Sequence, residues 1–362
     1  MKGEDLFIAL GKIDDKFIES AAPKKTVFYK KSGFKWAVAI AACLCLILLV
    51  FPFVSNTEEK PLKKIENYSV NFGTMGYEGT DELSLKNSND INPWNEKVKI
   101  ESLPVYKNLC YNSGKLSQGY YSLSQLKKQT LEVAKKLNLS LSPEQMNETE
   151  SEEIYSYALQ TSAGTVVSSG KGINLIITNG DSSLINKHME LTFGGKSSDK
   201  IVSGDYSTYS VDGELVDKET RSYLKGKNIV EDILNFNFNS HYLIRNDSEV
   251  TSLGDCLLNA SEKLGEYPIK SLDKAKENLL SGEYVTSADE KSVQGGKLRE
   301  EVIAKTDLIY YTAGNQELYL PYYRFYVNYY SGGDIQQYAY FYVCAVADEY
   351  LGSYTTFEGS YQ

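Results

Sequence analysis

Histidine is the side chain that most readily acts as a general base or metal ligand near neutral pH, and it occurs only at His188 and His241. Neither lies in the H-E-x-x-H spacing of zinc hydrolases, and no G-x-S-x-G segment offers a serine nucleophile. We therefore assign no catalytic residue, no metal ligand and no cofactor, and we predict a protein that is not an enzyme. An envelope hydrolase working through Asp and Glu is an alternative, and it would need a cleft with a perturbed pair of carboxyl groups.

Tyrosine is the unusual feature of the composition, because 14 of the 29 tyrosines lie between residues 306 and 362. Alternating rings in 319–330 and 336–347 predict two strands of a hairpin with rings on both faces. Tyr322, Tyr326 and Tyr329 are candidates for stacking against a glycan or another cell-wall ligand. The alternative is that these rings form cross-strand pairs packed beneath a helix.

An uncharged apolar run at 36–54 is long enough to cross a bilayer and predicts a transmembrane helix. Five lysines lie between residues 24 and 35, in the basic segment 23–35 before the run. Because cytoplasmic flanks carry the excess of Lys and Arg, we expect a cytoplasmic N-terminus and an extracellular C-terminal region at the cell membrane. Ile40-Ala41-Ala42-Cys43 fits a bacterial lipobox, so lipidation at Cys43 is the alternative to a plain span.

The N-terminal segment 1–22 has one apolar face, formed by Leu6, Leu10, Ile13 and Phe17 at helical spacing. A helix this short cannot bury that face by itself and must dock on something. The candidates are the lipid bilayer, a second copy of the segment, or a cytoplasmic regulator bound in the helix-in-groove mode.

Charge and composition describe an acidic globular protein. Of its 362 residues, 42% are hydrophobic and 24% charged, and the formal net charge is −10. Residues 55–362 hold 30 basic and 43 acidic residues. With no basic surface we expect no nucleic-acid partner. The three cysteines of this region, Cys110, Cys256 and Cys344, form at most one disulfide, and which of them pair is left open.

The region after the span predicts an α+β fold of two antiparallel-sheet-plus-helix units, 66–228 and 229–362, joined to the span by a linker at 55–65. Apolar periodicity predicts one helix at 122–139 and another near 271–280. Alternation predicts the following strands: 68–72, 97–106, 154–161, 164–169, 173–178, 189–193, 305–311, 319–330 and 336–347. Residues between the first two strands are expected to form a long loop.

Several phrases give the chain a resemblance to a family of uncharacterised single-pass membrane proteins from clostridia-type Gram-positive bacteria. These phrases are ALGKIDDKFIESA, WAVAIAACLCLILLV, FGTMGYEGT before NPWN, ESLPVYKN and LYLPYYRFYV. A short head before one span also resembles the layout of membrane-bound anti-sigma factors, in which the head binds a sigma factor and the outer domain senses. The zinc-binding anti-sigma pattern is not matched, because no His or Cys precedes the span.

Together these features predict a non-enzymatic, single-pass envelope sensor or regulator with a large extracytoplasmic domain. A membrane-anchored cell-wall or glycan-binding module is the alternative.

Overall fold

The computed structural model describes only part of the chain. The described residues are 62–66, 68–70, 78–109, 123–150, 155–161, 164–169, 172–177, 182–195, 198–210, 212–245, 250–254, 261–312, 316–329 and 334–356. All of them belong to the unit Leu62–Gln362, which is distinct from the unit Met1–Pro61. The predicted span 36–54 lies outside them, and no helix among the described residues is long and apolar enough to cross a membrane.

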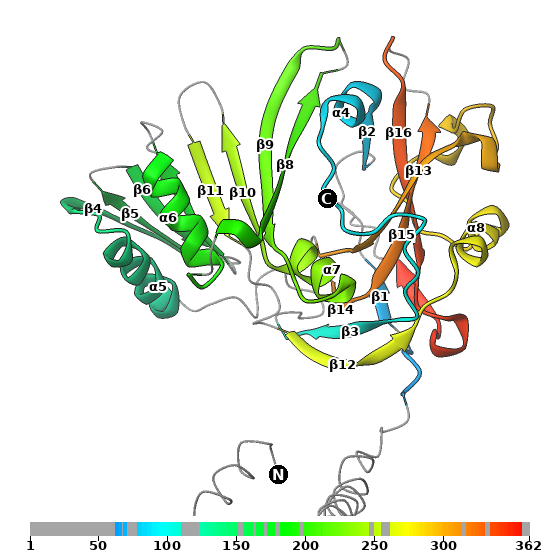
Figure 1. The fold of residues 1–362 in the computed structure, drawn as a ribbon, viewed down its shortest axis with the longest axis horizontal. Helices are drawn as coiled ribbons and strands as arrows, with labels where there is room; N and C mark the ends of the chain where they lie inside the picture. Colours follow the sequence, from blue (N-terminus) through cyan, green and yellow to red (C-terminus); the bar gives the residue numbers. More distant parts are fainter. Residues whose placement is uncertain are drawn as a thin grey trace, which may run out of the picture. The chain divides into compact units, whose positions relative to one another are not determined.

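The larger sheet is antiparallel and has the strand order β4-β5-β6-β7-β11-β10-β9-β8 (Figure 1). Its strands are β4 (Leu141–Glu150), β5 (Tyr155–Thr161), β6 (Gly164–Ser169), β7 (Gly172–Ile177), β8 (Ile201–Tyr209), β9 (Leu215–Leu224), β10 (Ser240–Arg245) and β11 (Val250–Gly254). The predictions for β5, β6 and β7 are confirmed. Helix α5 packs on β5 and β6, and α6 packs on β11.

Helix α5 (Leu123–Lys136) confirms the predicted helix at 122–139. Its apolar stripe is buried at Leu126, Thr130 and Ala134. The stripe packs against buried side chains of the sheet, among them Tyr157. The helix ends where Asn138 takes a left-handed conformation, with φ of 57°. This reversal lets the Leu139 N–H donate to the Ala134 carbonyl at 2.9 Å.

The predicted strand at 189–193 is wrong, because residues 189–192 belong to helix α6 (Ser182–Thr192) and Phe193 lies in the turn that follows it. Met189, Leu191 and Phe193 alternate within five residues, which is the pattern of a strand. Over the whole segment the buried positions Ile185 and His188 follow helical spacing instead. The helical spacing determines the structure because it places the buried residues of the whole segment on one face of a helix.

A second antiparallel sheet has the order β13-β15-β16-β2. Its strands are β13 (Ile303–Tyr310), β15 (Pro321–Tyr329), β16 (Gln337–Cys344) and β2 (Gly79–Asp81). The three long strands predicted in this part of the chain are confirmed. The predicted long loop after residue 72 contains β2 and helix α4 (Glu82–Asn87), whose first turn is capped by the Asp81 carboxylate.

Two smaller sheets complete the unit. The first has the order β12-β3-β14, with β12 (Ser261–Pro268), β3 (Ser102–Asn108) and β14 (Leu318–Tyr319), and the second pairs β1 (Tyr68–Val70) in parallel with β17 (Tyr354–Thr356). Strand β3 begins later than the predicted 97–106. The reason is a turn before it, in which the Val98 N–H donates to the Asn95 carbonyl and the Trp94 indole donates to the Val98 carbonyl.

Strands from both sides of the expected division at residue 228 share sheets. Strand β9 pairs with β10, β3 pairs with β12 and β14, and β2 pairs with β16. The fold is therefore α+β and largely antiparallel, and the position 228/229 does not separate one sheet from another.

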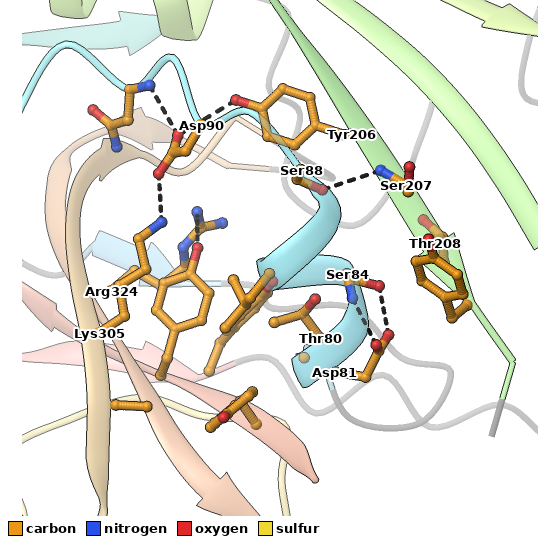
Figure 2. A pocket seen from close by; sticks show the side chains of 18 of the residues that line it. Thr80, Asp81, Ser84, Ser88, Asp90, Tyr206, Ser207, Thr208, Lys305 and Arg324 are labelled. Carbon is orange, nitrogen blue, oxygen red and sulfur yellow. Dashed lines mark hydrogen bonds and ion pairs between the residues drawn. The ribbon is translucent and has the colours of Figure 1, made fainter. Parts of the chain in front are cut away.

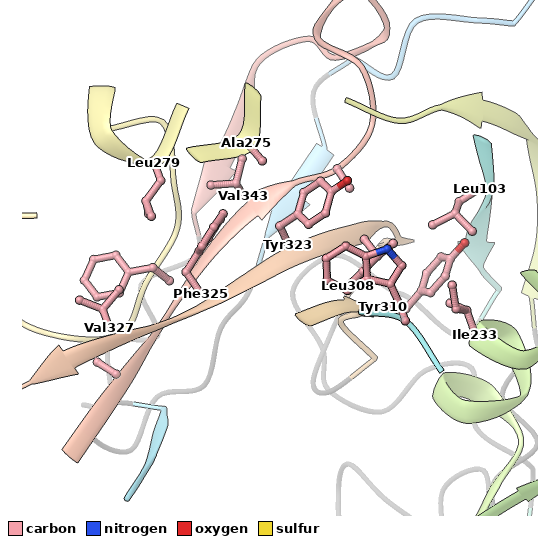
Figure 3. Close-up of a cluster of buried hydrophobic side chains, with 14 of the residues drawn as sticks. Leu103, Ile233, Ala275, Leu279, Leu308, Tyr310, Tyr323, Phe325, Val327 and Val343 are labelled. Atoms are coloured by element: carbon pink, nitrogen blue, oxygen red, sulfur yellow. The ribbon is translucent and has the colours of Figure 1, made fainter. Parts of the chain in front are cut away.

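The main core lies against one face of the β13-β15-β16-β2 sheet (Figure 3). Helix α8 (Leu272–Ser281) covers it with Ala275 and Leu279, and α7 (Ile229–Phe238) contributes Ile233. The predicted helix at 271–280 is thus confirmed. Its N-cap is Ser271, and its end is Gly282, whose φ of 92° favours glycine.

Candidate functional site

The face of the β13-β15-β16-β2 sheet opposite the core carries polar side chains. Antiparallel register places Asp307 opposite Arg324, Lys305 opposite Tyr326, and Arg324 opposite Tyr342. Residues at alternate positions, such as Leu308 and Phe325, point into the core. One face therefore packs against the helices, while part of the other face carries the polar residues of the site.

Asp307 is the centre of this polar face. Its Oδ2 accepts hydrogen bonds from Arg324 Nη2 at 2.8 Å and from the Tyr326 hydroxyl at 2.6 Å. Its Oδ1 lies 3.1 Å from Lys305 Nζ. Arg324 Nη2 also donates to the Tyr326 hydroxyl at 2.7 Å. The buried carboxylate is thus held by two cations and a phenol.

A segment after α4 brings a second carboxylate to the same lysine. Asp90 forms an ion pair with Lys305 and accepts a hydrogen bond from the Asn92 N–H at 2.9 Å (Figure 2). The hydroxyl of Tyr206, on β8, lies near Asp90 and accepts a hydrogen bond from the Ile91 N–H at 3.2 Å. The segment therefore connects β8 of the larger sheet to β13 of the second sheet.

Gly204 on β8 makes this connection possible. A Cβ at this position would lie 2.2 Å from the Asn89 carbonyl oxygen and 2.6 Å from Cγ2 of Ile91. Only glycine lets the segment approach the strand so closely, and that approach allows the Asn89 N–H to donate to the Asp205 carbonyl at 2.6 Å.

A cavity of about 890 Å³ lies beside the network, lined by α4, β8, β9, Phe236 of α7 and the polar sheet face (Figure 2). A second cavity of about 480 Å³ shares some of these residues and extends toward Glu78 and Tyr310. The Glu78 carboxylate accepts hydrogen bonds from the hydroxyls of Tyr342, at 2.7 Å, and Tyr311. These volumes are in the range of small-molecule sites.

The groups of the site are held in fixed charge states. Burial alone would raise the pKa of Asp307, but Arg324 and Lys305 outweigh burial and the pKa is lowered, so the carboxylate is ionised. Burial raises the pKa of Tyr206 to about 12 and that of Tyr326 well above its usual value. Both hydroxyls therefore remain protonated donors at neutral pH.

The three tyrosines predicted to stack on a ligand do not share one surface. Tyr326 lines the larger cavity, Tyr322 packs with Val105 and Ile309 in a separate apolar cluster, and Tyr329 belongs to the main core on the opposite face. Their exposed fractions are 3%, 3% and 9%, respectively, for Tyr326, Tyr322 and Tyr329. Packing within the fold thus accounts for Tyr329, whereas Tyr322 packs in its apolar cluster and also lines a third cavity, of about 520 Å³.

The predictions from sequence missed the charged members of the site, namely Asp90, Lys305, Asp307 and Arg324. One signal was present: Arg324 interrupts a strand of aromatic and apolar residues, and Lys305 and Asp307 stand at alternate positions of another strand. A charge in the middle of a buried strand needs a partner, which makes it a marker for a polar site.

The two histidines converge on one buried serine. His188 Nδ1 and His241 Nε2 each lie 2.7 Å from the Ser252 hydroxyl oxygen. Burial lowers the pKa of His188 to about 4, and burial together with His188 lowers the pKa of His241 to about 3. Both rings are neutral and hydrogen-bonded inside the fold, and neither lines the two cavities described above.

Among the described residues no group of His, Cys, Asp and Glu could hold a metal ion. Cys344 is a free thiol whose pKa burial raises to about 11, while Cys110, Cys256 and Cys43 lie outside the described residues. The candidate partner-binding residues Leu6, Leu10, Ile13 and Phe17 also lie outside them.

Comparisons with known proteins add little to this geometry. No protein-family model and no curated protein matches the sequence. A solved structure of an uncharacterized protein from Eubacterium rectale is 11% identical, with 68% of this chain and 84% of that chain covered and a TM-score of 0.34. A likeness at that score supports no assignment of function to this chain.

Proposed function

We propose that the protein is a non-enzymatic, single-pass envelope sensor or regulator, whose extracytoplasmic region binds a ligand and whose cytoplasmic head, residues 1–22, acts on a regulator. The observation that carries the proposal is the cavity beside Asp307, Arg324 and Lys305. It is built from two sheets and two helices, so a ligand bound there would contact several elements at once. The membrane part of the proposal rests on the sequence.

The charge states in the cavity favour binding over catalysis. A general acid or base works best when its pKa lies near the operating pH. The pKa of Asp307 is lowered and that of Tyr326 is raised, which moves both away from neutrality. Such groups offer a ligand a constant pattern of donors and charges.

The chain that follows the predicted span is held by the end of the extracytoplasmic region. The Ile65 N–H donates to the Tyr350 carbonyl at 2.8 Å, and the Gly352 N–H donates to the Ile65 carbonyl at 2.7 Å. The Tyr267 hydroxyl donates to the Lys63 carbonyl at 2.9 Å. Residues 345–352 follow directly on β16, which lines the cavity with Tyr340, so a short path of chain joins the cavity to the membrane-proximal segment.

The test is a crosslinked pull-down from native membranes that compares the full-length protein with a variant lacking residues 1–22. We expect a regulator to be recovered only when the head is present, and to be lost in the double variant Leu10→Asp, Phe17→Asp. A matched control, Asp14→Asn with Asp15→Asn, changes the polar face and should retain the partner. Equal recovery with and without the head would remove the regulatory part of the proposal.

A cell-wall or glycan-binding module is the second candidate, and one observation favours it. Tyr206, Tyr209, Tyr326, Tyr338 and Tyr340 line the same cavity as Lys305 and Asp90. Aromatic rings beside hydrogen-bonding groups suit sugar rings, which present apolar faces and hydroxyl edges.

Binding to purified wall material tests this candidate. We expect Tyr338→Ala, in the half-buried part of the cavity wall, to weaken binding. Tyr350→Ala is the control, because Tyr350 is also half-buried but packs on Tyr267 and lines neither cavity. Equal binding by the two variants would contradict the glycan interpretation.

A further inference from the structure

We propose that the junction of the two cavities binds an anionic group of the ligand, a carboxylate or a phosphate, between Arg221 of β9 and Arg324 of β15. The inference rests on the proposed function, in which this cleft binds a ligand, and it adds the chemistry that the ligand must carry.

The junction has a distinct composition. The residues that line both cavities are Gly79, Arg221, Phe236, Arg324 and Tyr340. Two of the five are arginines and none is acidic. The acidic residues of the larger cavity, such as Asp81 and Asp90, line that cavity alone, whereas Glu78 lines only the smaller one. Positive charge is therefore concentrated where the cavities meet.

Arg324 has one hydrogen-bond donor that no described residue uses. Its Nη2 serves Asp307 and Tyr326, but its Nε is buried and has no hydrogen-bond partner among the described residues. The guanidinium carbon lies 4.7 Å from the centre of the Tyr340 ring and 5.0 Å from that of Tyr326. These rings fix the plane of the guanidinium, and 23% of the side chain remains exposed. A buried donor without a partner indicates an acceptor that arrives with a ligand or solvent.

Arg221 carries the second positive charge of the junction. It stacks on Phe236 at 3.7 Å and on Tyr242 at 5.1 Å, and it donates from Nε to the Ser240 hydroxyl at 3.1 Å and from Nη2 to the Phe236 carbonyl. In the part of the chain that the structure describes, Arg221 forms no ion pair. Two arginines held by aromatic stacking suit the planar, bidentate recognition of carboxylate or phosphate.

The remaining charges limit what the rest of the ligand can be. Asp307 and Asp90 are paired with Arg324 and Lys305, and Glu78 is satisfied by two tyrosine hydroxyls. Asn92 Nδ2 is another buried donor without a partner among the described residues, and Asn92 lines the larger cavity. The larger cavity thus suits a body rich in hydroxyl or carbonyl oxygens attached to the anion.

Matched pairs of probes test the charge requirement on the full-length protein in detergent micelles, by isothermal titration calorimetry. N-acetylmuramic acid carries a carboxylate that N-acetylglucosamine lacks, and glycerol 3-phosphate carries a phosphate that glycerol lacks. We expect at least one anionic probe to bind about tenfold or more tightly than its neutral partner. The pair that shows the difference identifies the anion as a carboxylate or a phosphate.

The variants Arg221→Gln and Arg324→Lys should each abolish that preference. Arg324→Lys keeps a cation beside Asp307 but removes Nε. Arg221→Gln leaves the Asp307 network intact, so it tests the proposal even if Arg324→Lys fails to fold. Arg245→Gln on β10 makes the same charge change at an exposed arginine outside both cavities and should keep the preference.

Two results would overturn the inference: anionic probes that bind no better than their neutral partners, or a preference that survives in both variants. If neutral sugars bind equally well in a manner sensitive to Tyr338→Ala, ligand binding stands and only the anion requirement fails. If the unaltered protein binds none of the probes, and if the pull-down recovers no regulator that depends on residues 1–22, the proposed function itself fails.

Discussion

Asp307 and Arg324 meet directly across neighbouring strands, with the Asp307 Oδ2 atom 2.8 Å from Arg324 Nη2 on the face of the sheet that looks away from the core. The aromatic strand β15 thus gives one of its alternate positions to a cation, and β13 supplies the matching carboxylate. This pair fixes the electrostatics of the cavity and is the first target for mutation.

Asp307→Asn should destabilise the protein by about 3 kcal/mol, because it leaves the Arg324 charge largely buried without its carboxylate. Denaturant unfolding followed by the fluorescence of the buried Trp94 measures the change. Glu301→Gln is the control. Its carboxylate lies 3.7 Å from Arg299 in an exposed ion pair, and its removal should change stability very little. Similar effects of the two variants would mean that the Asp307 pair contributes no more than a surface pair.

Acid should weaken the fold through His188 and His241. Their pKa values are lowered to about 4 and about 3 in the folded protein, against about 6.5 in the unfolded chain. The unfolded chain therefore binds more protons, so stability is complete above about pH 6.5 and falls toward pH 4, by up to about 1.4 kcal/mol per pH unit for each histidine.

The double variant His188→Gln, His241→Gln provides the comparison in unfolding experiments between pH 7 and pH 4.5. This window lies above that of Asp307, whose lowered pKa makes its contribution disappear only as the pH falls below about 3.8. The variant should be less stable at pH 7 but lose less stability on acidification. Parallel pH profiles of the two proteins would rule out the histidines as the cause.

Gly204→Ala should destabilise the protein by about 2 kcal/mol, because the new methyl group would overlap the Asn89 carbonyl and the Ile91 side chain. The segment that carries Asp90 would move, and any ligand held near Lys305 would bind more weakly. Thermal unfolding and calorimetry measure the two effects. Ser203→Ala at the neighbouring position loses only the hydrogen bond to Ser222 and should cost about 1 kcal/mol without an effect on binding. Unchanged stability in Gly204→Ala would show that the segment adapts freely.

Membrane topology is open to a direct test with reporter fusions. Alkaline phosphatase, which is active only outside the cytoplasm, should be active when fused after residue 362 and inactive when fused before residue 1. The reason is the excess of lysines before the run 36–54. Replacing the five lysines between residues 24 and 35 with Gln should reduce this difference, and equal activities of the two original fusions would contradict the predicted orientation.

Local pattern was sufficient for much of the fold. The stripe Leu126, Thr130, Ala134 predicted α5, and alternating rings predicted β15 and β16, because each segment has one face to bury and periodicity reveals it. It failed at α6, where five alternating residues imitated a strand, and at 97–101, where side chains of Trp94 and Asn95 stabilise a turn.

The site, in contrast, depends on contacts between distant residues. The sequence by itself determined that Tyr322 and Tyr326 share one face and Tyr329 the other, but only the packing of β8, β9, α4 and α7 decided that Tyr326 reaches the cavity beside Asp307. Lys305 meets Asp90 across a separation of 215 residues, and His188 meets Ser252 across 64. Such pairings depend on the order of the strands in the sheets and on how closely two backbone segments approach, as at Gly204. Neither the strand order nor this distance produces a periodic pattern in the sequence.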